Sequence, residues 1–247
     1  MKKISKISLL HIYKLVFRSC LFIAVIIFDI LNRTDVLTYN AILPCIVWLS
    51  FFIEMILRFF PSDFESMGCQ KQFRRNFEAN EECTTPQNQS WKVTALVAVL
   101  WLTMNGVIGL LYFLGIFDRA ILVLVAIGYS VCDIICILFF CPFQTWIMKN
   151  RCCTTCRIYN WDFAMMFTPL VFIPSVYTYT LLGLALLLLL YWEVSYRLYP
   201  ERFSPATNKC LDCSHCQEKL CSHKKQLQGF LKKYKKRFFP PKNTKTE

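Results

Sequence analysis

Four cysteines lie within twelve residues of the stretch NKCLDCSHCQEKLCSH, which runs from Asn208 to His223. Two of the spacings in this run are C-x-x-C, which lets two sulfurs of one tight turn converge on a single ion. Another C-x-x-C pair occurs earlier in the chain, in RCCTTCR, at Cys153 and Cys156. Dense thiols in a reducing compartment are typical of metal binding rather than of disulfides. The sequence therefore predicts a metal site, and membrane helices must position its ligands.

Two ligand sets are open for this site. In the first set, Cys153 and Cys156 join two tail cysteines around a tetrahedral zinc ion. This ion would hold the two cytosolic ends of the last helical hairpin together. In the second set, the tail alone holds a 4Fe–4S cluster. We prefer zinc, and reduced thiols without metal, some of them palmitoylated, are the remaining alternative. The candidate ligands are Cys153, Cys156, Cys210, Cys213, Cys216 and Cys221.

The tail run resembles the bacterial ferredoxin run C-x2-C-x2-C-x3-C-P in its first three cysteines. It departs from that run in having four residues before Cys221 and Ser222 in place of the proline. The resemblance is confined to this short run, and it implies an iron–sulfur cluster as the alternative cofactor.

The remainder of the chain is strongly apolar. The 247 residues are 55% hydrophobic, and the apolar residues come in blocks long enough to cross a bilayer. Since lipid offers the backbone no hydrogen-bond partners, such blocks must be helices. The expected fold is an all-α, polytopic integral membrane helical bundle of about six transmembrane helices. The spans are expected near residues 15–31, 37–60, 93–117, 120–143, 163–178 and 179–196, which gives a transmembrane domain at 1–196 and a Cys-rich tail at 197–247.

The last apolar block decides the topology. Residues 163–196 form either one kinked helix or two short spans that divide near IPSVYTYT, and Pro169 and Pro174 favour the division. Thirteen of the 28 Lys and Arg follow residue 196, so an even number of spans places this tail on the cytosolic side, as the positive-inside rule requires. We therefore expect three antiparallel hairpins in the cell membrane, with both termini and the tail cytoplasmic.

Three polar residues fall at one depth within the expected spans. Arg18, Asn105 and Asp133 each lie about 18–20 Å below the outer helix end at 1.5 Å per residue. Since charges in hydrocarbon tend to be paired, we expect an ion pair between Arg18 and Asp133, with Asn105 completing the hydrogen bonds. The alternative is that Arg18 extends to the inner interface.

Three further expectations concern residues around these sites. Glu54 and Arg58 are spaced to form a local pair on one helix. The segment 61–92 is polar and is expected to be loosely ordered. The cysteines within the spans are expected to fill the core without chemistry, namely Cys20, Cys45, Cys132, Cys136 and Cys141.

The tail after His223 has the pattern of an amphipathic helix, with an apolar stripe that begins at Leu227 and ends at Phe238. Its basic residues predict binding to anionic phospholipid headgroups of the bilayer in preference to nucleic acid. These residues are Lys224, Lys225, Lys232, Lys233, Lys235, Lys236 and Arg237.

The sequence lacks the Walker loop, the dinucleotide fingerprint and the hydrolase elbow, so it favours a role other than catalysis. The preferred function is a membrane scaffold or accessory protein with a zinc site and a lipid-binding tail. A membrane-bound iron–sulfur redox protein and a transporter of a small solute or soft metal are the alternatives. The sequence does not identify a protein partner.

Overall fold

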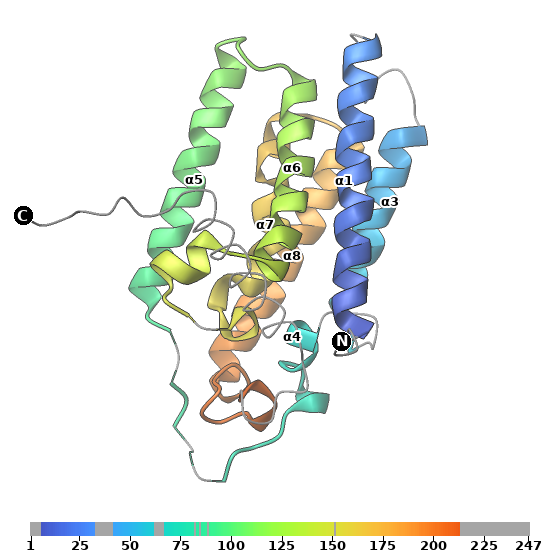
Figure 1. Cartoon of the computed structure of the whole chain (residues 1–247). Helices are drawn as coiled ribbons and strands as arrows, with labels where there is room; N and C mark the ends of the chain where they lie inside the picture. Colours follow the sequence, from blue (N-terminus) through green and yellow to red (C-terminus); the bar gives the residue numbers. More distant parts are fainter. Residues whose placement is uncertain are drawn as a thin grey trace, which may run out of the picture.

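The computed structural model describes residues 6–32, 42–61, 67–81, 83, 85–87, 89–150 and 152–212. Within these ranges the chain is helical, and its single β-type pairing is an isolated bridge between Ala79 and Asn208. The expected all-helical class is therefore confirmed. The long helices are α1 (Lys6–Asn32), α3 (Ile42–Leu57), α5 (Trp91–Phe113), α6 (Arg119–Leu138) and α8 (Val176–Leu198), as Figure 1 shows.

Shorter helices connect the long ones, most of them at the end of the bundle where α1 begins. They are α4 (Met67–Gln70), η1 (Arg74–Asn76), the π-helical turn η2 (Phe143–Ile147), η3 (Cys153–Thr155), η4 (Arg157–Trp161), α7 (Asp162–Phe167), η5 (Thr168–Phe172), η6 (Pro200–Arg202) and η7 (Lys209–Leu211).

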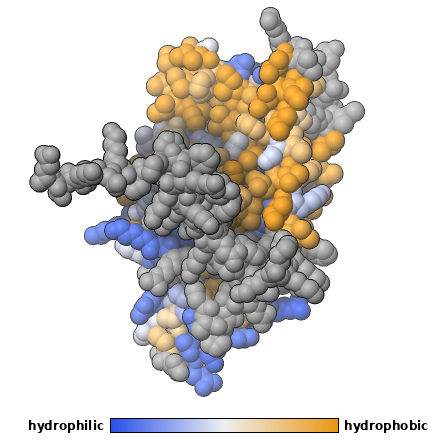
Figure 2. Space-filling view, viewed as in Figure 1, coloured by the Kyte–Doolittle hydropathy of each residue, from blue (hydrophilic) through white to orange (hydrophobic). Residues whose placement is uncertain are grey.

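Four of the described helices are long and apolar enough to cross a membrane, rather than the six that we expected. They are Leu9–Ile30, Trp91–Phe113, Arg119–Leu138 and Val176–Leu198. The expected span at 37–60 corresponds to α3, which has only 16 residues, fewer than the roughly 20 of a typical span. Figure 2 shows hydrophobic residues over the upper part of the molecule and hydrophilic residues at the lower end, as expected for a bundle embedded in lipid.

The expected span at 163–178 is replaced by α7 and η5. These two short helices rise only about 19 Å at ideal geometry, against roughly 30 Å of hydrocarbon. The helix breaks at Ile173–Ser175, within the IPSVYTYT stretch, and α8 begins at Val176. The buried hydroxyl of Thr178 donates to the Ile173 carbonyl at 2.6 Å. This bond satisfies a backbone group at the break, as a membrane interior requires.

The expected arrangement in three hairpins is not confirmed, although α7 and η5 do pack against α8. The main neighbour of α1 is α6, and the main neighbour of α3 is α8, while α7 and η5 pack between α6 and α8. A continuous buried core joins α3, α6, α7 and α8 through Phe51, Leu122, Met166 and Leu188. Segments far apart in the sequence therefore hold the bundle together.

Three connecting segments pack together at the end of the bundle where α1 begins. We call the described residues of 67–90, 139–161 and 199–212 the loop platform. Asn208 is fully buried there, and its side-chain amide donates to the carbonyls of Lys71 at 3.1 Å and Arg202 at 2.9 Å. Gln72 extends the contact, because its amide donates to the Thr154 carbonyl at 2.8 Å. The expectation of a loosely ordered 61–92 segment was therefore wrong for its described part.

Candidate functional site

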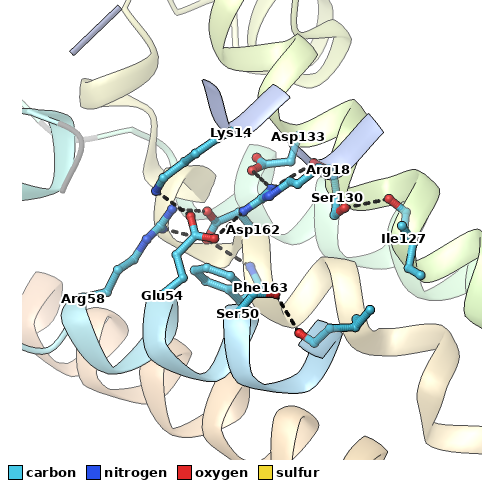
Figure 3. Close-up of polar contacts among 11 residues, drawn as sticks. Lys14, Arg18, Ser50, Glu54, Arg58, Ile127, Ser130, Asp133, Asp162 and Phe163 are labelled. Atoms are coloured by element: carbon cyan, nitrogen blue, oxygen red, sulfur yellow. Dashed lines mark hydrogen bonds and ion pairs between the residues drawn. The ribbon is translucent and has the colours of Figure 1, made fainter. Parts of the chain in front are cut away.

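Six charged side chains form a neutral network inside the bundle (Figure 3). Three are positive and three are negative, and they come from four different helices. Ionised groups buried away from water are stable only when they are paired, so the equal count of both signs accounts for their presence. The members are Lys14 and Arg18 of α1, Glu54 of α3, Arg58 directly after the end of α3, Asp133 of α6 and Asp162 of α7.

Arg18 lies at the centre of this charge network and is only 2% exposed. Its guanidinium donates to Glu54 Oε2 at 2.9 Å, to the Ser130 carbonyl at 2.8 Å and to Asp133 Oδ2 at 3.4 Å. The expected contact between Arg18 and Asp133 is present, but Glu54 is the closer carboxylate. Lys14 completes the arrangement with a 2.6 Å ion pair to the other oxygen of Glu54.

Arg58 forms the second part of the charge network. Its guanidinium makes two parallel bonds to Asp162, with Nη1 to Oδ1 at 2.9 Å and Nη2 to Oδ2 at 2.6 Å. The same guanidinium lies over the ring of Phe163, 4.6 Å from its centroid. We expected a local pair of Glu54 with Arg58, whereas these close ion pairs reach other helices. They tie α3 to α1 and α7.

Asn105 does not complete the hydrogen bonds of Arg18, so this part of the expectation was wrong. Its side-chain amide donates to the Trp101 carbonyl of its own helix at 3.0 Å. Its Oδ1 is buried and accepts no hydrogen bond from the described residues. Asn105 shares the depth of Arg18, but depth does not determine which direction a side chain points on a helix.

The C-x-x-C pair of the loop platform faces the bundle. Cys153 and Cys156 line a cavity of about 310 Å³ that lies between α5, α6, α7 and the loop platform. The cysteines that we expected to be inert core residues of α6 line the same cavity. The cavity cysteines are Cys132, Cys136, Cys141, Cys153 and Cys156.

The first tail cysteine lies in a different environment. Cys210 follows the buried Asn208, whose side-chain oxygen accepts from the Cys210 backbone at 3.1 Å, and its thiol contacts Glu78. Cys213, Cys216 and Cys221 lie outside the described residues, as do the basic residues from Lys224 to Arg237. In the described part of the chain, no three His, Cys, Asp or Glu side chains are grouped closely enough to hold a metal.

Burial raises the pKa of two thiols of the loop platform. Desolvation raises the pKa of the Cys156 thiol to about 12, and nearby thiols add to the effect. Desolvation also raises the pKa of the Cys210 thiol, followed by the negative charge of Glu78. Since a thiol with an ordinary or raised pKa is protonated at neutral pH, a metal that binds either sulfur displaces a proton.

Sequence reasoning missed two members of the charge network. Lys14 and Asp162 lie just outside the expected spans, and each completes an ion pair with a residue inside them. A usable signal existed for Lys14, because it lies four residues before Arg18 and so on the same face of α1. No comparable signal joins Asp162 to Arg58, which lies 104 residues away.

Glu54 should matter more than Asp133 for stability. We expect Glu54→Gln to lower the free energy of unfolding by roughly 3–5 kcal/mol, because it leaves Lys14 and Arg18 without their closest carboxylate. Asp133→Asn should cost less, since the contact of Asp133 with Arg18 is longer, at 3.4 Å. Thermal unfolding of the purified protein measures both changes. Asp118→Asn, at the exposed start of α6, is the control, and an equal effect of all three substitutions would contradict the geometry.

Comparisons with protein-family models, with curated proteins and with solved structures each found no significant match. The functional conclusion therefore rests on the arrangement of the residues in the charge network, the cavity and the loop platform.

Proposed function

We propose that this chain is a multi-pass membrane accessory protein whose tail binds one zinc ion beside the loop platform. The ligands would be the four tail cysteines, Cys210, Cys213, Cys216 and Cys221, which together satisfy a tetrahedral zinc ion. The zinc would hold the tail in a defined shape and present it to a partner as a scaffold.

One observation carries this proposal. The buried Asn208 anchors the chain two residues before Cys210, so the Cys-rich run starts from a defined point on the loop platform. The other C-x-x-C pair, Cys153 and Cys156, lines the cavity inside the bundle. We therefore leave this pair out of the zinc site and assign all four ligands to the tail. This placement favours a tail site over our first expectation, in which the zinc joined the two pairs.

We place the tail and both termini in the cytosol as part of the same proposal. The loop platform and the start of α1 share one end of the bundle in Figure 1, and thirteen Lys and Arg follow residue 196. The positive-inside rule assigns such an end to the cytosol, where thiols remain reduced and available to a metal.

Metal analysis of anaerobically purified protein tests the tail site. We expect about one zinc per chain, lost in Cys213→Ser with Cys216→Ser and retained in the control pair Cys20→Ser with Cys45→Ser. Cys20 and Cys45 are exposed on α1 and α3 and are outside the proposed set. A brown protein that absorbs at about 400 nm would instead assign an iron–sulfur cluster. Zinc retained after loss of Cys213 and Cys216 would contradict the proposal.

We also propose that the basic part of the tail lies on anionic lipid. Each Lys or Arg near such a surface contributes about 1 kcal/mol, and the apolar stripe from Leu227 to Phe238 would enter the interface. A peptide of residues 223–242 should therefore sediment with anionic vesicles, less strongly as salt is added. A scrambled peptide of the same composition is the control for the stripe. Equal binding to neutral and anionic vesicles would contradict an electrostatic role.

A further inference from the structure

The cavity that adjoins the charge network is lined by many sulfur atoms. Five thiols line it, and they come from α6 and from the loop platform. Three thioethers line it as well, from Met104 of α5 and from Met165 and Met166 of α7. Eight sulfur atoms from four parts of the chain therefore surround a space of about 310 Å³.

Two of the thiols are in direct contact. The side chains of Cys136 and Cys141 are hydrogen-bonded to each other, although α6 ends between them at Leu138. The backbone N–H of Gln144 donates to Cys141 Sγ at 3.4 Å, and Cys153 Sγ donates to Gln144 Oε1 at 3.0 Å. The turn after α6 thus holds the two sulfurs together and links them to the C-x-x-C pair.

The number and type of donors select the kind of ion. Zinc requires four ligands, and the described residues bring no three His, Cys, Asp or Glu side chains together in a metal-binding group. Soft sulfur donors select Cu(I), which is satisfied by two or three of them. A Cys pair with one methionine thioether meets that requirement.

The charge balance of the cavity also favours Cu(I). Asp133 and Asp162 also line the cavity, but Arg18 and Arg58 already neutralise them. A buried site is most stable when its total charge is zero. One thiolate, one neutral thiol and one thioether around a monovalent ion meet this condition, and only one proton has to leave.

We propose that this cavity binds Cu(I) through Cys136 and Cys141, with a cavity methionine as the third ligand. On binding, Cu(I) forms a bond to each sulfur and one S–H proton is released to solvent, with no change in oxidation state. The site is distinct from the zinc site proposed for the tail. It would make the protein a membrane-embedded carrier or store of a soft monovalent metal.

Titration of the full-length protein with Cu(I) against the chelator bathocuproine disulfonate tests the proposal. The tail cysteines are first replaced in the variant Cys210→Ser, Cys213→Ser, Cys216→Ser and Cys221→Ser, so that the cavity is measured separately. We expect this variant to retain about one Cu(I) per chain. Adding Cys136→Ser and Cys141→Ser should weaken binding at least about tenfold, whereas adding Cys20→Ser and Cys45→Ser should not. Unchanged affinity in a folded Cys136→Ser, Cys141→Ser protein would overturn the site.

A second measurement, on the variant that lacks only the four tail cysteines, keeps Cys136 and Cys141 in place and so does not depend on whether their substitution disturbs folding. N-ethylmaleimide labelling of Cys136 and Cys141, read by peptide mass spectrometry, should slow when Cu(I) is added and remain unchanged with Zn(II). Equal labelling with and without Cu(I) would overturn the proposal. Neither result depends on the tail, so failure of the zinc site and failure of the cavity site are distinguishable.

Discussion

A guanidinium cannot lose its proton inside a protein, so the burial of Arg18 imposes a condition on the whole bundle. Carboxylates must reach it from other helices, and Glu54 and Asp133 do so from α3 and α6. Arg58 imposes the same condition at a second point and is matched by Asp162 of α7. These requirements fix the depth of four helices relative to one another, and apolar packing alone would leave that depth less well defined.

The charge network also explains the form of the broken helix. Asp162 is the first residue of α7 and is held by Arg58, so the chain from Asp162 to Ile173 must begin well inside the bundle. Only a short α-helix and a 3₁₀ turn fit before the chain reverses into α8. Two of the three carboxylates of the network, Asp133 and Asp162, also line the sulfur-lined cavity. The network therefore positions the cavity without contributing net charge to it.

The general architecture could be predicted from the sequence because hydrophobic length is a local property. Residues 93–117 and 120–143 correspond to α5 and α6 for this reason, and Pro174 marked the break before α8. The extent of α7 could not be predicted in this way, because its residues are as apolar as those of a spanning helix. The contact with Arg58 and the burial of Phe163 show that α7 begins inside the bundle.

The candidate sites were predicted less completely, because they depend on side-chain direction. Equal depth in the membrane predicted that Asp133 and Asn105 would both contact Arg18. The contact with Asp133 is present, whereas the Asn105 side chain donates to the Trp101 carbonyl of its own helix. The i, i+4 spacing of Cys132 and Cys136 was compatible with ordinary packing. Their relation to Cys141 and Cys153 depends on the turn after α6, and no sequence pattern that we recognised predicts it.

The most direct test of the charge network is a double-mutant cycle on its bidentate pair. Thermal unfolding of Arg58→Met, Asp162→Asn and the double variant gives the energy that couples the two residues. If charge neutrality stabilises the bundle, each single substitution leaves a buried charge without its partner and lowers the free energy of unfolding. The double variant should then regain part of that free energy, with a coupling energy of about 2 kcal/mol. Effects that simply add would show that the pair is incidental and would contradict the central role of charge neutrality in this bundle.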